Sequence, residues 1–356
     1  MEKVTYILGA GFSAPLGLPV MSNFLFKSKD MYFSDTEKYD YFNGIFDSIN
    51  KLSVIKNFYE SDLFNIEEIL SITEMLSFLD GEELNKDFKR YISEVIKYYT
   101  PEVKPYSENG GFPGNWDDFI FGNSSIESGL YYLIGHFLRA SFQETSNNSD
   151  GTRIFKATID NANDVRYSIL SLNYDSVLEN ATDIISKQFE TSDEILFNKT
   201  EYDPSWRKTH LMKLHGCVHT GNIVPPTWAK GTNTGIVPIW KNAFEILKET
   251  NHIRFVGYSL PNADSYIKYL LKSAVLESKH LKSIDVLCMD NNGSVRERYE
   301  QFFEFNFFRF KNVDVMDYAS GLKKKIKDKS RNSPHGNKKI NLNMLEKYHN
   351  DFMLTP

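Results

Sequence analysis

Short apolar runs alternate with amphipathic stretches along much of the chain, and this alternation predicts the fold. Each run holds four to six residues and ends at glycine or at polar residues, which is typical of strands buried on both faces. Strands are predicted at 4–8, 167–172, 211–214, 253–256 and 284–289. Helices are predicted after Ser176, which forms a capping-box spacing with Glu179, at 240–249, after a cap at Asn262, and at 294–303. The pattern predicts an α/β fold, with a Rossmann-like, mostly parallel sheet and helices on both faces.

The segment from about 38 to 145 has a different pattern, with apolar and aromatic residues at helical spacing. Three stripes carry it, around Ile69, Ile92 and Ile134, and a glycine- and proline-rich break at 106–116 separates the second from the third. We expect an α-helical insertion that covers one side of the sheet. The polar run 144–150 is predicted to be a loop before the α/β pattern resumes.

The C-terminal part is basic and poor in apolar residues. We therefore predict one domain over 1–322 and, over 323–356, a basic linker followed by a short helix at 342–354. A solvated linker is the favoured interpretation of the lysine-rich run, and the alternative is a docking arm for an acidic partner or nucleic acid.

Composition narrows the class of protein. The net charge of −6 over 356 residues argues against a protein that binds nucleic acid over its whole surface, so any such contact is expected only indirectly. Two cysteines, Cys217 and Cys288, cannot form a disulfide framework or a four-thiolate zinc site. No apolar run reaches the roughly 20 residues that cross a bilayer, and no signal peptide is evident at the start. We expect a cytoplasmic protein without membrane contact.

A polar cluster follows each predicted strand. The carboxyl ends of parallel strands lie at the same edge of a sheet. Five segments should therefore meet in one crevice: 9–13, 173–175, His215, 257–260 and 290–292. The first, Gly9-x-Gly11-x-x-Ala14, fits a dinucleotide-binding fingerprint in which backbone amides face a phosphate. Asp30 has the spacing of the usual acidic partner, but no strand precedes it, so this is not a standard dehydrogenase half.

The motifs, in their order along the chain, resemble those of sirtuins. Specifically, the chain resembles the zinc-less, sirtuin-like NAD-hydrolase domains of bacterial antiphage defence proteins. Gly9-Ala10-Gly11-Phe12-Ser13 is similar to the opening motif, Ser171 to Asp175 to the Thr-Gln-Asn-Ile-Asp motif, and His215-Gly216 to the catalytic His-Gly. Gly257-Tyr258-Ser259-Leu260-Pro261 and Pro225 to Trp228 resemble the defence branch in particular, and the similarity spans residues 3–20 and about 165–292.

The resemblance implies NAD⁺ as substrate and assigns roles to residues. His215 would act as a base on a water or ribose hydroxyl, and Asn173 would orient that group. Gly9, Ala10, Gly11 and Ser13 would cradle the pyrophosphate, Phe12 would cover the nicotinamide, and Asp175 would shape the ribose pocket. Gly257, Ser259 and Leu260 would line the phosphate and adenosine-ribose side, and Asp290 and Asn291 would bind ribose hydroxyls or adenine.

Two departures from sirtuin deacylases change the expected activity. The paired Cys-x-x-Cys motifs of the zinc module are missing, and Pro19-Val20-Met21-Ser22 replaces Pro-Asp-Phe-Arg. We therefore expect no zinc and favour an NAD⁺ glycohydrolase, the toxic effector of an abortive-infection system. Control is expected through homo-oligomerisation or a regulatory partner of ATPase or Argonaute type. The alternatives are an NAD- or ADP-ribose-binding sensor without turnover and a deacylase with an altered cleft. His215, Cys217 and His219 alternate and suggest a metal site, but no fourth ligand is evident.

Overall fold

A computed structural model gives the fold. It describes residues 1–52, 66–80, 84–102, 128–147, 153–159, 164–188, 190–191, 196–199, 201–224, 234–262, 264–330, 338–339 and 342–355. The predicted break at 106–116 and the segment 225–228 lie outside these residues.

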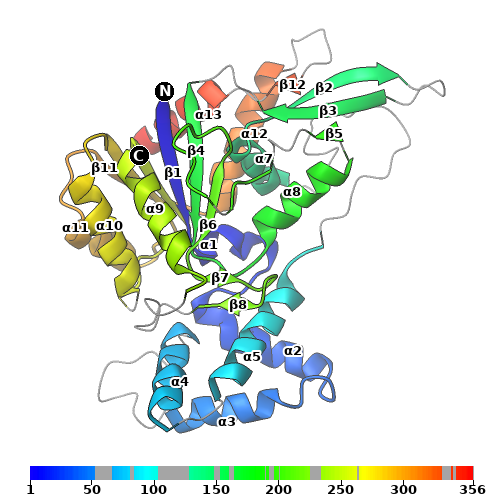
Figure 1. The fold of residues 1–356 in the computed structure, drawn as a ribbon, viewed down its shortest axis with the longest axis vertical. Helices are drawn as coiled ribbons and strands as arrows, with labels where there is room; N and C mark the ends of the chain where they lie inside the picture. Colours follow the sequence, from blue (N-terminus) through cyan, green and yellow to red (C-terminus); the bar gives the residue numbers. More distant parts are fainter. Residues whose placement is uncertain are drawn as a thin grey trace.

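A six-stranded sheet forms the centre of the molecule, and all of its strands are parallel (Figure 1). In spatial order the strands are β11 (Phe308–Asn312), β10 (Ser283–Cys288), β9 (His252–Val256), β1 (Glu2–Leu8), β4 (Val165–Ser171) and β6 (His210–Lys213). Leu8 aligns with Ser171 on one side and with Val256 on the other, so these three strands end level. Five of the strands were predicted from their apolar runs. The edge strand β11 was not, because its arginine and lysine interrupt the pattern.

Helices cover both faces of this sheet, which confirms the predicted Rossmann-like α/β fold. On β1, Val4, Tyr6 and Leu8 belong to one apolar core, whereas Ile7 belongs to the other. The first core includes α7 (Ser128–Phe137), α8 (Val177–Gln188), α12 (Val315–Ser330) and α13 (Leu342–Leu354). The second includes α9 (Val237–Glu249), α10 (Ser265–Glu277) and α11 (Ser294–Phe302).

The order of the strands places a crevice at the end of β1. From β1 the chain continues to β4 and β6 on one side, and it then crosses to β9, β10 and β11 on the other. The connections that leave β1 and β9 therefore diverge. Ligands of open α/β sheets bind at such a switch point, outside the carboxyl ends of the strands.

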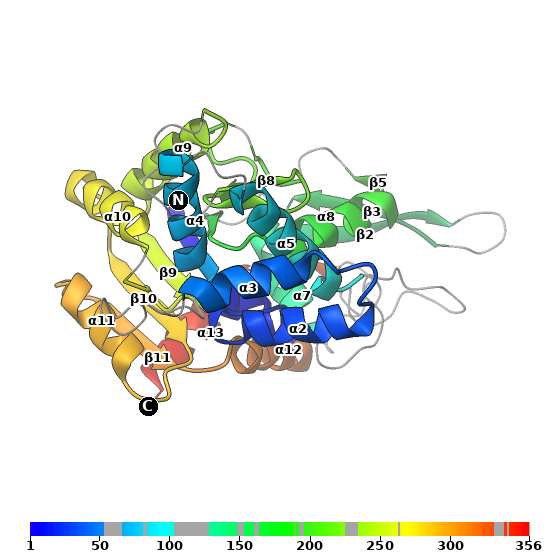
Figure 2. The same ribbon diagram turned by 90° about the horizontal axis from the view of Figure 1, so that it is seen from below.

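The helical insertion lies elsewhere than predicted. Its helices α3 (Phe42–Leu52), α4 (Ile66–Asp80) and α5 (Leu84–Tyr99), together with α2 (Phe24–Ser34), lie beyond the carboxyl ends of the strands. Figure 2, seen from below, shows them across the end of the sheet. Tyr91 on α5 organises this unit, because the rings of Phe24, Phe42 and Phe88 lie 5.7, 4.8 and 6.3 Å from its own. The third stripe, in α7, does pack on a face of the central sheet, where the Phe137 ring lies 4.5 Å from that of Tyr6.

Two smaller sheets were not predicted. One comprises β12 (Lys338–Lys339), β2 (Ala140–Asn147), β3 (Arg153–Ile159) and β5 (Glu190–Thr191), and the other β7 (Gly216–Cys217) and β8 (Asn222–Ile223). The polar run expected to form a loop at 144–150 continues β2 as far as Asn147, and its remainder lies outside the described residues. Backbone pairing with β3 holds these polar residues in a strand. A search for alternating apolar residues does not detect such a strand.

Part of the predicted linker is helical. Helix α12 continues through the predicted start of the linker at 323 and ends at Ser330, whereas α13 has the bounds that were predicted. Glu346 on α13 bonds Arg254 of β9 through both carboxylate oxygens, one of them 2.9 Å from the guanidinium. The division at 322 remains a prediction. Among the described helices, none combines the length and the apolar character that a membrane span requires.

Candidate functional site

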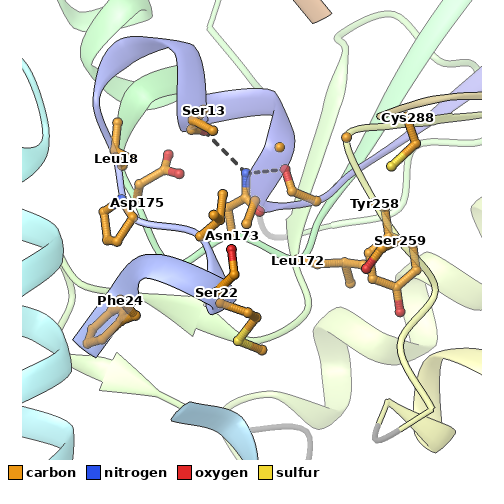
Figure 3. Close-up of a pocket in the computed structure, with 18 of the residues that line it drawn as sticks. Ser13, Leu18, Ser22, Phe24, Leu172, Asn173, Asp175, Tyr258, Ser259 and Cys288 are labelled. Atoms are coloured by element: carbon orange, nitrogen blue, oxygen red, sulfur yellow. Dashed lines mark hydrogen bonds between the residues drawn. The ribbon is translucent and has the colours of Figure 1, made fainter. Parts of the chain in front are cut away.

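A cavity of about 660 Å³ opens at the switch point, a volume within the ~300–1,000 Å³ of ligand pockets (Figure 3). Ten of the thirteen predicted site residues line it: Gly9, Ala10, Gly11, Ser13, Asn173, Asp175, His215, Gly257, Ser259 and Asn291. They come from the ends of β1, β4, β6, β9 and β10. The helical unit supplies an apolar wall through Phe24, Ile66, Ile92 and Ile96.

The glycines at this edge bring two loops into backbone contact. A Cβ on Gly9 would lie 2.6 Å from the carbonyl oxygen of Gly257, and one on Gly257 would lie 2.3 Å from the Phe12 nitrogen. The amide of Gly11 donates to the carbonyl of Gly257 at 2.9 Å, and that of Phe12 donates to Gly9 at 2.9 Å. These two amides are therefore occupied within the protein, and the glycine spacing has a structural cause besides the expected phosphate cradle.

Asn173 fastens the loop after β4 to the turn after β1. Its Nδ2 donates to the carbonyl of Gly9 at 2.9 Å and to Ser13 Oγ at 3.2 Å, the two contacts drawn in Figure 3. Its own backbone nitrogen donates to Ser171 Oγ at 3.2 Å. Because Nδ2 has two acceptors, the plane of the carboxamide is fixed at the cavity wall.

Asp175 and Lys213 form a buried charged group beside this loop. Burial raises the pKa of Asp175, although Lys213 opposes the rise. Asp175 Oδ1 accepts from the Val177 amide at 3.1 Å, an Asx turn that leads into α8. The Lys213 ammonium donates to the Asp175 carbonyl and lies 3.7 Å from Glu179 Oε1. Burial lowers the pKa of Lys213, but the charges of Glu179 and Asp175 outweigh it and the pKa is raised.

His215 follows β6 and is only 1% exposed. Its position is fixed through the backbone, since Trp240 Nε1 donates to the Leu214 carbonyl and the Val224 amide donates to that of His215, each at 2.9 Å. The Tyr174 ring meets the imidazole edge-on, with centroids 5.8 Å apart. The backbone hydrogen bonds and the Tyr174 ring contact thus hold His215 at the cavity wall.

Asp264 is a cavity residue that the sequence did not reveal. Its Oδ2 lies 3.5 Å from His215 Nε2 and accepts from the Tyr258 hydroxyl at 2.9 Å. The helix was predicted to start after a cap at Asn262, but α10 starts at Ser265 with Asp264 as its N-cap. Asn262 instead accepts from Lys268 at 3.2 Å. The sequence offers two capping residues before this helix, Asn262 and Asp264, and the prediction took the first.

Three predicted site residues do not line the cavity. Phe12 is 1% exposed and its ring lies 6.3 Å from that of Phe137, so it packs in the first core and not at the cavity. Leu260 is fully buried in the second core, with a left-handed φ of 50°. Asp290 accepts from the amides of Val295 and Arg296 at 3.2 and 2.9 Å. Burial raises the pKa of Asp290, but these amide hydrogen bonds lower it further, as expected of a helix-capping carboxylate.

His215, Cys217 and His219, which alternate after β6, do not come together as metal ligands would. His219 is exposed, whereas His215 and Cys217 are buried. Within the described part of the chain, no three His, Cys, Asp or Glu side chains form a group that could hold a metal. Cys217 and Cys288 are both free and buried.

Comparison with known proteins identifies part of the chain. Residues 167–330 match the family model of the SIR2-like domain, so the chain contains a sirtuin-like domain, as its motifs predicted. Among solved structures, one match is a crystal structure of Sir2 in complex with the inhibitor EX-527, 2′-O-acetyl-ADP-ribose and deacetylated p53 peptide. Its identity is 10%, over 91% of this chain and 93% of that one, and a TM-score of 0.30 is too low to carry an argument. No curated protein matches the chain significantly.

Proposed function

We propose that this protein is an NAD⁺ glycohydrolase, which releases nicotinamide and ADP-ribose in the cavity between β1 and β9. The observation that carries the proposal is that Asn173 and His215, from the ends of two neighbouring strands, line the same cavity. The match to the SIR2-like domain includes both residues, and sirtuins use NAD⁺. The proposal leaves the Gly9–Ser13 turn as one wall of the substrate site.

The chemistry needs little beyond these groups. The nicotinamide–ribose bond carries a cationic leaving group, and its cleavage develops an oxocarbenium-like centre comparable to that of glycoside hydrolysis. Water adds to the ribose C1′ while the electron pair of the C–N bond returns to nicotinamide. His215 takes the proton from the water, and Asn173 holds the ribose or the water in place. The apolar wall of the helical unit excludes bulk water.

The test is release of nicotinamide from NAD⁺ by the full chain, measured by chromatography. His215→Ala should lower turnover by about 10²–10⁴-fold, because general-base help is lost. Asn173→Ala should abolish or strongly reduce turnover as well, because the ribose or the water is no longer held in place. His219→Ala is the matched control, since His219 is exposed four residues further on, and this variant should retain full activity. Full turnover by both site variants would contradict the proposal.

The same experiment separates two other functions. A sensor would bind NAD⁺ or ADP-ribose in a calorimeter and release no nicotinamide. A deacylase would release nicotinamide only when an acyl-lysine peptide is added. Either result would replace hydrolysis as the function of the cavity.

In a cell, we propose that this activity depletes cytoplasmic NAD⁺ as the toxic step of an antiphage response, held back by self-association or a regulatory partner until infection. The support is the resemblance of the motifs to those of the defence branch. Expression in bacteria challenged with phage should lower NAD⁺ and stop growth, whereas His215→Ala should do neither. An unchanged NAD⁺ concentration in every phage challenge would refute the cellular role but not the proposed hydrolysis of NAD⁺.

A further inference from the structure

We propose that Asp264 is the positioning residue of His215: it holds the imidazole with its proton on Nε2 and balances the charge when the ring takes a second proton. The inference rests on the proposed function, because it assigns a partner to the base of that reaction. It goes further by naming a carboxylate outside the motifs on which the function is argued.

The two side chains meet inside the protein. They are 1% and 2% exposed, and Oδ2 of Asp264 lies 3.5 Å from Nε2 of His215. Both residues line the cavity, although they come from different halves of the sheet, one after β6 and the other after β9. Catalytic hydrogen bonds are often long without substrate and shorten when it binds. The contact therefore joins the two sides of the switch point at the cavity wall.

Asp264 occupies a helix-capping position without using its side chain as a cap. It is the N-cap of α10, and its side chain makes no capping hydrogen bond. Aspartate at this position normally bonds an amide of the first turn and stabilises the helix by doing so. Here Oδ2 is directed to Tyr258 and His215 instead. This orientation is what a role at the cavity requires.

The Asp264 carboxylate has a hydroxyl donor beside it in addition to the imidazole. A buried carboxylate is costly unless donors or a cation face it, and the Tyr258 hydroxyl supplies one donor at 2.9 Å. Tyr258 itself packs in the second core, so this donor is held in place. Among the described residues, Tyr174 lies against the imidazole ring, and Lys268 of α10 interacts electrostatically with Asp264, in addition to Tyr258.

The assignment fixes the path of the proton. With Nε2–H directed at Asp264, the neutral ring has its lone pair on Nδ1, and Nδ1 accepts the proton of the attacking water. The ring then carries protons on both nitrogens, and Asp264 stays ionised and stabilises it, as in other acid–histidine pairs. The proton leaves to solvent after ADP-ribose departs, so Asp264 never takes part in a covalent step.

A kinetic comparison tests the role. Asp264→Asn should lower kcat for nicotinamide release by about 10²-fold or more, while KM for NAD⁺ changes by less than about threefold, because orientation of the base matters mainly in the transition state. Tyr258→Phe should lower kcat less. Asn262→Ala is the control from the same loop, and it should keep the wild-type kcat. Unchanged kcat in Asp264→Asn, with a wild type that does release nicotinamide, would overturn this inference and leave the proposed function intact.

A second measurement does not depend on turnover. In full chain labelled with ¹⁵N-histidine, the signal that disappears in His215→Gln belongs to His215, and its ring shifts report which nitrogen carries the proton. We expect the Nε2–H form in the wild type and a different distribution in Asp264→Leu, which removes the acceptor. An Nδ1–H form in the wild type, or the same form in both proteins, would refute the pairing even if NAD⁺ hydrolysis fails.

Discussion

Replacing Gly257 by alanine should separate the two loops that form the cavity wall. Gly257 has a φ of +64°, a left-handed conformation that costs an alanine about 1–2 kcal/mol. The new Cβ would also lie 2.3 Å from the Phe12 nitrogen and 2.4 Å from the Gly11 carbonyl carbon. Both are backbone atoms, so the turn after β1 must shift, and overpacking of this kind costs about 1–3 kcal/mol. We expect a total destabilisation of about 2–5 kcal/mol.

Gly221→Ala provides the matched control. Gly221 has a φ of +70°, but no atom of the described residues lies within 4 Å of its Cβ position. It should therefore show the conformational cost of about 1–2 kcal/mol without the clash. Denaturant unfolding of both variants measures the difference, and calorimetry with ADP-ribose should show weaker binding only for Gly257→Ala. Equal destabilisation by the two substitutions, with equal binding, would refute the close packing of these loops.

Two further predictions concern the framework of the site. Glu346→Ala removes the partner of the buried Arg254 and should lower the free energy of unfolding, measured in urea, by about 3–5 kcal/mol. Asp351→Ala, at an exposed pair with Lys325, is the control and should lower it by less than about 1 kcal/mol. Similar losses in the two variants would contradict the difference in burial. Burial lowers the pKa of His136 from 6.5 to about 4, so the unfolded chain binds a proton that the folded chain does not, and stability should fall as pH falls from about 6.5 towards 4. Between pH 7 and pH 5 this residue should lower the free energy of unfolding by roughly 2 kcal/mol. Unfolding curves of His136→Gln should lack this loss. If the two proteins show the same pH dependence, His136 is not its source.

The strands around the site could be predicted because they are buried on both faces. Such strands appear as short apolar runs, and the turn residues after them mark the carboxyl edge where ligands bind. The edge strand β11 and the polar strand β2 lack this pattern. Periodicity also predicted α4 and α5, but not their place at the end of the sheet. That place depends on how the aromatic residues around Tyr91 pack, and helical spacing carries no such information.

Within the site, the sequence predicted the segments better than the individual side chains. Adjacent side chains in these segments face different surroundings, so Phe12 and Leu260 are buried in the two cores while Ser13 and Ser259 line the cavity. Asp264 was missed because an aspartate before a helix is usually only a cap. Its contact with His215 joins residues far apart in the chain, which local patterns cannot indicate.

The most direct test of the account is a crystal structure of the His215→Ala variant grown with NAD⁺, in which slow turnover should preserve the substrate. We expect the nicotinamide–ribose bond beside Asn173 and the Cβ of residue 215, with the rest of the dinucleotide along the Gly9–Ser13 and Gly257–Ser259 turns. NAD⁺ bound elsewhere, or a cavity that stays empty at saturating NAD⁺, would contradict it.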